Sequence, residues 1–253
     1  MTTLKSIAID WPTQPQNVSV LSTTRIGGFS VTPYDDGSGQ GGLNLGDHVA
    51  DDGETVKRNR QRLRQHCPND PVWLKQVHGT RVVNAATVQG VPEADASFTA
   101  QAGVVCAILT ADCMPVLFCD RRGSVVAAAH AGWRGLASGV LENTVAAMRE
   151  AGANDVMAWM GPAIGPQKFE VGEDVVLAFA HLGAVAQSAF LPIGERPGKF
   201  LANLPLLVRC ILNKQDVMHV SGGSDCTVTD TERFYSFRRD GVTGRMASLI
   251  WIR

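Results

Sequence analysis

The chain has 253 residues, of which 45% are hydrophobic and 19% are charged, and its formal net charge at pH 7 is −1. This composition is typical of a globular protein with enough length for a large core, and it excludes a disordered chain. Domains that bind nucleic acid usually carry a net basic charge. The charge balance therefore argues against nucleic acid as a partner and favours a small-molecule substrate.

The sequence also argues against a secreted or membrane protein. Residues 1–15 contain no apolar segment typical of a secretory signal. The longest apolar stretch, residues 103–119, is interrupted by Thr110, Asp112 and Pro115 and is unsuited to crossing a bilayer. The six cysteines form no C-x-x-C pair, so we expect reduced thiols or metal ligands, no membrane partner and a cytoplasmic location.

The predicted elements mix strands and helices along the chain. A glycine-rich surface loop at 35–42 precedes a predicted helix, and two continuous apolar runs predict strands that are buried on both faces. Apolar residues at helical spacing predict three further helices, the last capped by Asn203. In chain order, the predicted elements are a helix at 54–66, strands at 104–109 and 124–129, and helices at 136–150, 173–182 and 204–213. This order predicts an α/β (α+β) fold, with mixed sheets between helices in one domain over 1–253.

Three chemically reactive side chains share a local pattern. His78, Cys113 and His130 each lie where an apolar, strand-like run gives way to a turn. Strand ends form the rim of a sheet, and imidazole and thiolate are ligands that zinc or copper takes. Three such ligands would leave a fourth position open, as in a catalytic metal site. Spacing alone does not bring them together, because buried histidine and cysteine also serve as ordinary core residues.

Two further segments have the chemistry of an anion site. The turn at 130–135 joins a strand to a helix start and carries Arg134, which suits phosphate. The segment at 222–245 combines arginines, among them Arg238, with aromatic residues, and resembles a wall for an anionic or sugar-bearing ligand. From pattern alone, a packed turn and a solvated hairpin explain these segments equally well.

The sequence closely resembles the bacterial family of laccase-domain or polyphenol oxidase proteins, whose members are also named purine nucleoside phosphorylase and peptidoglycan editing factor. No single matching segment is specific, but together they cover nearly the whole chain. The matching segments are residues 22–28, LNLGDHVADD (43–52), NRQRL (59–63), WLKQVHG (73–79), ADASFT (94–99), LTADCMPVLF (109–118), AAHAGWRG (128–135), MGPAIGPQKFEVG (160–172) and CTVTDTERFYSFRRDGVTGRM (226–246).

The resemblance implies a mixed α/β fold with two sheets between helices, and a zinc site formed by His78, Cys113 and His130. It implies phosphorolysis of adenosine, inosine, guanosine and methylthioadenosine to base and ribose 1-phosphate, plus deamination of adenosine. The implied partners are therefore a purine nucleoside and phosphate. Charge and position in the family motifs make four residues our predicted substrate or phosphate contacts: Asn44, Arg58, Arg134 and Arg238.

The three activities recorded in the family make different demands on the residues. Zinc-dependent deamination needs a general acid or base, and the H-x-E with P-C-x-x-C signature of nucleobase deaminases is absent. Asp112 and Asp95 are the candidates, and we place Asp112 with His78, Cys113 and His130 in the catalytic set. Copper-dependent phenol oxidation is the weaker expectation, because six histidines without an H-x-H pair do not supply a multicopper centre. Copper nevertheless remains the alternative metal, since it binds the same ligands tightly.

Two further hypotheses need neither phosphorolysis nor deamination. In the first, Cys113 is a nucleophile with His130 as its base, and hydrolyses peptidoglycan precursors. In the second, the protein only binds a metal or a nucleotide, without turnover. We expect a monomer in all of these cases.

Overall fold

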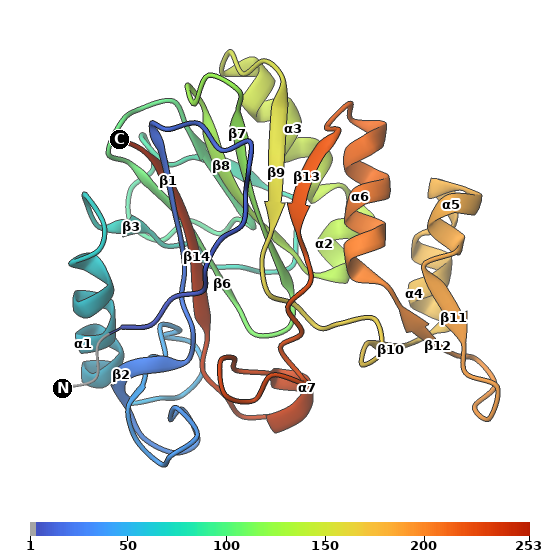
Figure 1. Ribbon diagram of the computed structural model, residues 1–253, viewed down its shortest axis with the longest axis horizontal. Coiled ribbons are helices and arrows are strands. Elements are labelled where there is room, and N and C mark those ends of the chain that lie inside the picture. The colour runs from blue at the N-terminus through green and yellow to red at the C-terminus, as the bar shows by residue number, and fades with distance from the viewer. Residues whose placement is uncertain (1–3) are drawn as a thin grey trace.

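Two β-sheets lie face to face in the computed structural model, which describes residues 4–253 (Figure 1). The first sheet has four strands, in the order β1 (Val18–Ser22), β14 (Met246–Ile252), β6 (Val105–Thr110) and β3 (Pro71–Val72). The second has six, in the order β13 (His219–Gly222), β9 (Val156–Met160), β7 (Met114–Asp120), β8 (Val126–Ala131), β5 (Ala96–Thr99) and β4 (Val82–Asn84). Each sheet contains parallel and antiparallel pairs, so the predicted mixed α/β fold is confirmed.

The central strands are buried on both faces. On β7, Leu117 and Cys119 pack between the two sheets, whereas Val116 and Phe118 belong to the core beneath the helices. Side chains alternate between the faces of a strand, so a strand covered on both sides reads as one continuous apolar run. This is why β6 and β8 were recognisable at 104–109 and 124–129.

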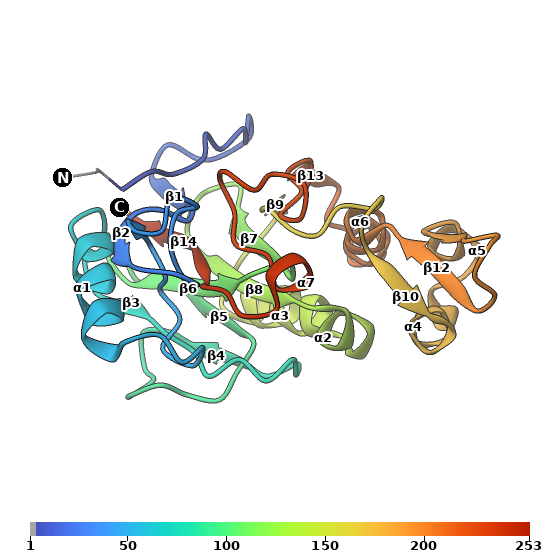
Figure 2. The same cartoon turned by 90° about the horizontal axis from the view of Figure 1, so that it is seen from below.

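Helices cover the outer faces of both sheets (Figure 2). Helix α1 (Gly53–Arg64) packs Leu63 against the outer face of the four-stranded sheet, beside β2 (Ile26–Ser30). Helices α2 (Trp133–Ser138), α3 (Val140–Glu150) and α6 (Leu204–Lys214) pack over the six-stranded sheet. Asn203 caps α6 as predicted, because its side chain accepts a hydrogen bond from the Leu206 N–H.

Two predicted helices are each divided in the structure. The helix expected at 136–150 is split between α2 and α3, because Gly139 has a φ of 103° and ends the first helix in a left-handed conformation. The helix expected at 173–182 consists of α4 (Glu173–Ala178) and a short 3₁₀ turn (Ala180–Leu182). The predicted loop at 35–42 contains no helix, and only its last residue, Gly42, pairs with a strand, through isolated bridges to Ile26 and Ser30 of β2.

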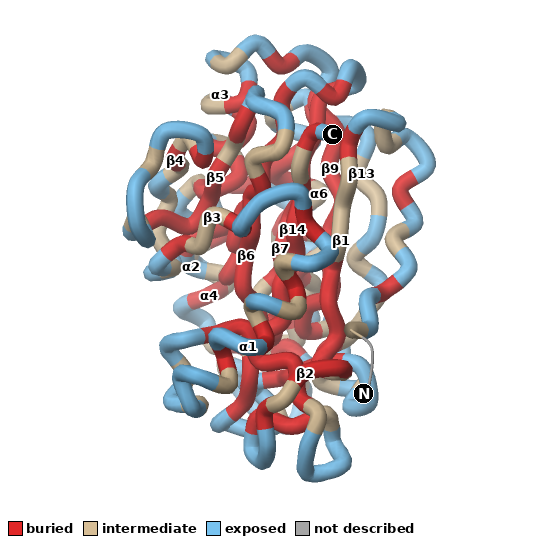
Figure 3. Tube along the Cα trace, turned by 90° about the vertical axis from the view of Figure 1, so that its left-hand side faces the viewer, coloured by how far each residue is buried: buried red, intermediate tan, exposed pale blue. Residues whose placement is uncertain are grey.

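A small lobe projects from the six-stranded sheet on the far side of α6 (Figure 2). It contains a three-stranded sheet in the order β10 (Glu170–Gly172), β12 (Lys199–Ala202) and β11 (Phe190–Pro192), with α4 and α5 (Ala184–Gln187) packed on it. Figure 3 shows that buried chain is concentrated along the strands, while the loops around them are exposed. In the described part of the chain, no helix has both the length and the apolar character needed to cross a membrane.

The chain passes from one sheet to the other at residues 111–113, between the end of β6 and the start of β7. Asp112 in this turn has a φ of 91°, a conformation that non-glycine residues rarely adopt. The same end of the sandwich receives the end of β8 and the short helix α7 (Phe237–Asp240), which is seen below the sheets in Figure 1. Loops from distant parts of the sequence therefore meet here.

Candidate metal centre and its cavity

The three predicted metal ligands lie together at this end of the sandwich. Cys113 follows the turn after β6, His130 lies near the end of β8, and His78 lies in the loop between β3 and β4. Their ligand atoms are all within 4.8 Å of one another. The two imidazole rings meet edge to face, with centroids 4.7 Å apart. His130 is buried, Cys113 is partly exposed and His78 is exposed, so the centre opens to one side.

Two glycines of the strand-to-helix turn make this approach feasible. A Cβ atom at Gly132 would lie 2.6 Å from Nδ1 of His78 and 3.1 Å from Sγ of Cys113. A Cβ atom at Gly135 would lie 2.8 Å from the carbonyl oxygen of Gly79. Any larger residue at either position would push the start of α2 away from the loop that carries His78.

The carboxylate of Asp95 is hydrogen-bonded to two of the predicted ligands, His78 and His130. This carboxylate is fully buried, and its Oδ1 accepts hydrogen bonds from Nδ1 of His130 at 2.8 Å and the backbone N–H of His78 at 2.9 Å. Its Oδ2 accepts from the N–H groups of Gly79 at 2.7 Å and Val77 at 3.1 Å. Burial raises the pKa of Asp95, but these hydrogen bonds and the charge of His130 outweigh burial, and the net pKa is lowered. Asp95 is therefore placed to orient His130 and the His78 loop rather than to face the cavity.

The residues present fit a soft or borderline metal cation. Asp95 engages Nδ1 of His130, which leaves Nε2 for the side of the ring that faces Cys113. Burial lowers the pKa of His130, but the negative charges of Cys113 and Asp95 outweigh it and raise that pKa to about 9. Surroundings that stabilise a proton in this way also stabilise a metal cation. A histidine, cysteine, histidine donor set suits zinc or copper.

A cavity of about 440 Å³ opens beside the three ligands. Six of the predicted site residues line it, namely His78, Asp112, Cys113, His130, Arg134 and Arg238. Arg245 makes a third arginine, and the aromatic side chains come from Trp133, Phe169 and Phe237. The cavity therefore has a cationic and partly aromatic lining, although the chain as a whole has a net charge of only −1.

Two predicted contact residues are not among the residues that line this cavity. Asn44 is fully buried, and its amide donates to the Gly46 carbonyl and to Asp51, while its oxygen accepts from the N–H groups of Gly46 and Arg245. These four hydrogen bonds use the full capacity of a carboxamide. The guanidinium of Arg58 instead lies on the ring of Phe29, 4.0 Å from its centroid, on the exposed side of α1. Neither pattern of contacts is visible from the sequence.

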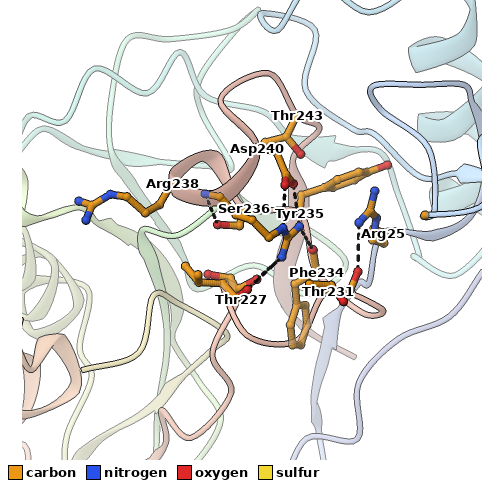
Figure 4. Close-up of polar contacts among 12 residues, drawn as sticks. Arg25, Thr227, Thr231, Phe234, Tyr235, Ser236, Arg238, Asp240 and Thr243 are labelled. Carbon is orange, nitrogen blue, oxygen red and sulfur yellow. Dashed lines mark hydrogen bonds and ion pairs between the residues drawn. The ribbon is translucent and has the colours of Figure 1, made fainter. Parts of the chain in front are cut away.

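Asp112 fastens the carboxyl-terminal segment to the turn between the two sheets. Its two carboxylate oxygens accept hydrogen bonds from Oγ1 of Thr227 and from the backbone N–H of Arg238, both at 2.6 Å. This contact brings the start of α7, with Phe237 and Arg238, to the edge of the cavity. The side chain of Arg238 points away from the other residues drawn in Figure 4.

A partly buried polar cluster holds the same segment from the other side (Figure 4). Oγ of Ser236 caps α7 by accepting a hydrogen bond from the N–H of Arg239 at 3.2 Å. The guanidinium of Arg239 in turn donates to the carbonyl oxygens of Thr227 and Phe234. Arg25 donates to the Thr231 carbonyl at 3.0 Å. These contacts fix the backbone of the segment that carries Arg238 and Arg245.

Several residues that line the cavity were not among the predicted site residues, including His48, Gln76 and Arg245. Each of these three lies within a segment that carries the family resemblance, at 43–52, 73–79 and 226–246, and Arg245 also ends the arginine-bearing segment at 222–245. Gln76 exchanges two 2.8 Å hydrogen bonds with the backbone of Leu109, so it also fixes the end of β6.

With this geometry established, comparison with known proteins identifies the class. Residues 19–253 match the family described as multi-copper polyphenol oxidoreductase laccase, and the chain belongs to this family. The resemblance drawn from the sequence motifs is thereby confirmed.

Several relatives carry a more specific name. The chain is 51% identical to a purine nucleoside phosphorylase of Pseudomonas aeruginosa, over 96% of this chain and 97% of the relative. It is 48% identical to the purine nucleoside phosphorylase YfiH of Escherichia coli, over 98% and 99% of the two chains. The fold is similar to the crystal structure of a Neisseria meningitidis protein, with a TM-score of 0.89, 49% identity and 99% of both chains covered.

Proposed function

We propose that this protein is a zinc-dependent enzyme that cleaves purine nucleosides with phosphate, to base and ribose 1-phosphate, and also deaminates adenosine. One observation carries the proposal: three arginines and three aromatic side chains line the cavity that adjoins the histidine–cysteine–histidine cluster. The names of the relatives support phosphorolysis. The cavity volume is within the range, about 300–1,000 Å³, that is typical of small-molecule sites.

Phosphorolysis requires phosphate and ribose to be held side by side. Arg134, Arg238 and Arg245 supply cationic donors, and arginine matches the geometry of phosphate oxygens. Arg134 also lies over the ring of Trp133, with its central carbon 4.5 Å from the ring centroid. The exposed ring of Phe237 offers a flat apolar face for a purine base at the opening. We propose that these side chains bind and align the two substrates, which is the main demand of a displacement at C1′.

Zinc-dependent deamination requires a metal ion and a residue that acts as general acid or base. His78, Cys113 and His130 would hold the zinc ion, which would supply Lewis acidity at the cavity. Asp112 lines the cavity next to Cys113 and is our proposed general acid or base. Its oxygens already accept two hydrogen bonds, but a carboxylate has about four acceptor positions, so the capacity to take a proton remains.

A second candidate function is favoured by the contact between Asp95 and His130. Asp95 orients His130, and His130 faces Cys113, which is the order of groups in a cysteine hydrolase with a carboxylate behind its base. Cys113 would then attack an amide of a peptidoglycan precursor without a metal. Copper in place of zinc would correspond to the oxidase name of the family.

Product analysis by mass spectrometry separates these functions. Zinc-loaded protein is incubated with adenosine, with and without phosphate, beside a Cys113→Ala variant. We expect adenine and ribose 1-phosphate with phosphate, inosine without it, and neither product from the variant. Cys67→Ala is the control, because Cys67 is a buried free thiol that is not among the residues that line the cavity. Absence of nucleoside turnover, with alkylation of Cys113 and amide hydrolysis that survive a chelator, would replace this proposal by the hydrolase.

A further inference from the structure

The described residues that line the cavity include five side chains, other than arginine, able to exchange a proton. Three are the candidate metal ligands, whose donor atoms a bound metal would occupy. The fourth, Asp112, is held by the carboxyl-terminal segment and is already our proposed acid or base for deamination. The fifth is His48, which belongs to neither group. Arginine stays protonated in proteins and does not exchange protons at neutral pH.

The loop that carries His48 is fixed toward the cavity by its neighbours. The Asn44 amide bonds to both the N–H and the carbonyl of Gly46, and also to the N–H of Arg245. A Cβ atom at Gly46 would lie 2.8 Å from Cγ of Arg245 and 3.4 Å from Cε1 of His48. Because Gly46 has no Cβ atom, the side chains of Arg245 and His48 can both lie close to its backbone. The His48 imidazole keeps 56% of its surface exposed, so it can reach a bound ligand and exchange protons with water.

Charged groups on both sides set the proton affinity of this imidazole. Oδ1 of Asp47 lies 3.6 Å from Nδ1 of His48, and the other carboxylate oxygen of Asp47 pairs with Arg60 at 3.2 Å. Burial and the charges of Arg245 and Arg60 lower the pKa of His48, against the opposing effect of Asp47. The protonated imidazole is therefore a stronger acid than a free imidazolium, while its protonated fraction at neutral pH is smaller, so the donor acts best at mildly acidic pH.

We propose that His48 is a further catalytic residue, which protonates the purine base as it leaves the ribose. This inference rests on the proposed phosphorolysis. A phosphate oxygen forms a bond to C1′, the bond from C1′ to N9 breaks, and its electron pair passes into the purine ring. The proton of His48 passes to N7 of the purine, which departs as a neutral base. The neutral imidazole is then protonated again by the acidic proton of the newly formed phosphate ester, directly or through water.

The experiment compares two nucleosides that differ in their need for this proton. Guanosine requires protonation at N7, whereas 7-methylguanosine already carries a positive charge on its base and leaves without one. We expect His48→Gln to lower kcat for guanosine about 100-fold, the lower end of the usual contribution of general acid catalysis. The same variant should retain the wild-type kcat for 7-methylguanosine. His66→Gln, at an exposed position outside the cavity, should leave both rates unchanged.

The outcomes distinguish this inference from the function on which it rests. Equal loss on both nucleosides, or no loss on either, overturns the role of His48 while phosphorolysis itself stands. A wild-type protein that cleaves neither nucleoside in the presence of phosphate overturns the proposed function, and this inference with it. Undiminished turnover of 7-methylguanosine by the variant also shows that the variant is folded, so a selective loss on guanosine identifies proton donation.

Discussion

Replacing Asp95 by asparagine tests whether this carboxylate organises the metal centre. The substitution preserves shape but turns one oxygen into an NH₂ group, which donates and does not accept. If that group replaces Oδ1, it faces the N–H of His78 and Nδ1 of His130. If it replaces Oδ2, it faces the N–H groups of Val77 and Gly79. In the first orientation the His78 bond is lost, and the His130 bond survives only if Nδ1 becomes the acceptor and Nε2 carries the proton, which withdraws Nε2 from a metal. In the second orientation both backbone bonds are lost.

The expected magnitude follows from this count. A hydrogen bond to a charged group contributes about 1.5–3 kcal/mol, so the loss of one or two lowers the free energy of unfolding by about 1.5–6 kcal/mol. Asp95 is fully buried, so water does not replace the missing partners. Orientation of a metal-ligating histidine by a second residue is typically worth 10- to 100-fold in metal affinity, and we expect a loss of that size for zinc.

Two assays measure these effects separately. Urea unfolding of the metal-free protein gives the change in stability, and competition with a chromophoric chelator gives the zinc affinity. Asp120→Asn is the matched control: Asp120 is equally buried and accepts hydrogen bonds from the N–H groups of Ser124 and Val125, but it lies at the far end of β7. It should destabilise the fold without weakening zinc binding. An Asp95→Asn variant that binds zinc as tightly as the wild type would refute the assignment of Asp95.

Three other outcomes are expected. Gly132→Ala would place a Cβ atom 2.6 Å from Nδ1 of His78, so zinc affinity measured by chelator competition should fall at least 10-fold, whereas Gly53→Ala, with open space around it, should change nothing. Arg134→Ala should raise the KM for phosphate about 10-fold or more, because a charge-assisted hydrogen bond contributes about 1.5–3 kcal/mol; an unchanged phosphate dependence would remove Arg134 from the site. For the pH dependence, the lowered pKa of His48 means that its protonated form is lost below the usual histidine range as pH rises. kcat/KM for guanosine should therefore already fall with rising pH below the usual histidine pKa in the wild type, and a His48→Gln variant with the same decline would contradict the proton-donor role.

The fold was predictable wherever burial imposes a pattern on the sequence. Strands β6 and β8 are covered on both faces, so their apolar runs are unambiguous. Strand β7 follows β6 in the sequence and could not be distinguished from it within the same apolar stretch, because the turn that separates the two strands is only three residues long. Similarly, Gly139 divides a stripe of apolar residues that reads as one helix. Such breaks depend on backbone conformation, which periodicity does not record.

The sequence pattern predicted the three candidate metal ligands as a group, but it said less about the residues around them. Histidine and cysteine at strand ends are distinctive chemically, and the structure brings all three together. Asp95 resembled an acid or base candidate in the sequence, and only its four long-range hydrogen bonds place it behind His130. Asn44 is polar and lies in a family motif, yet it is saturated by contacts within the protein.

Backbone strain at the site connects its stability to its chemistry. Five non-glycine residues in the described chain have a positive φ, and two of them, His78 at 59° and Asp112 at 91°, lie at the candidate metal centre. Such conformations cost free energy and persist only where surrounding contacts impose them. Asp95 imposes the first through the N–H of His78, while Thr227 and Arg238 hold the carboxylate of the second. The hydrogen bonds that offset the strain are thus the ones that aim a metal ligand and a cavity arginine, so a variant cannot lose these bonds without disturbing both folding and the site.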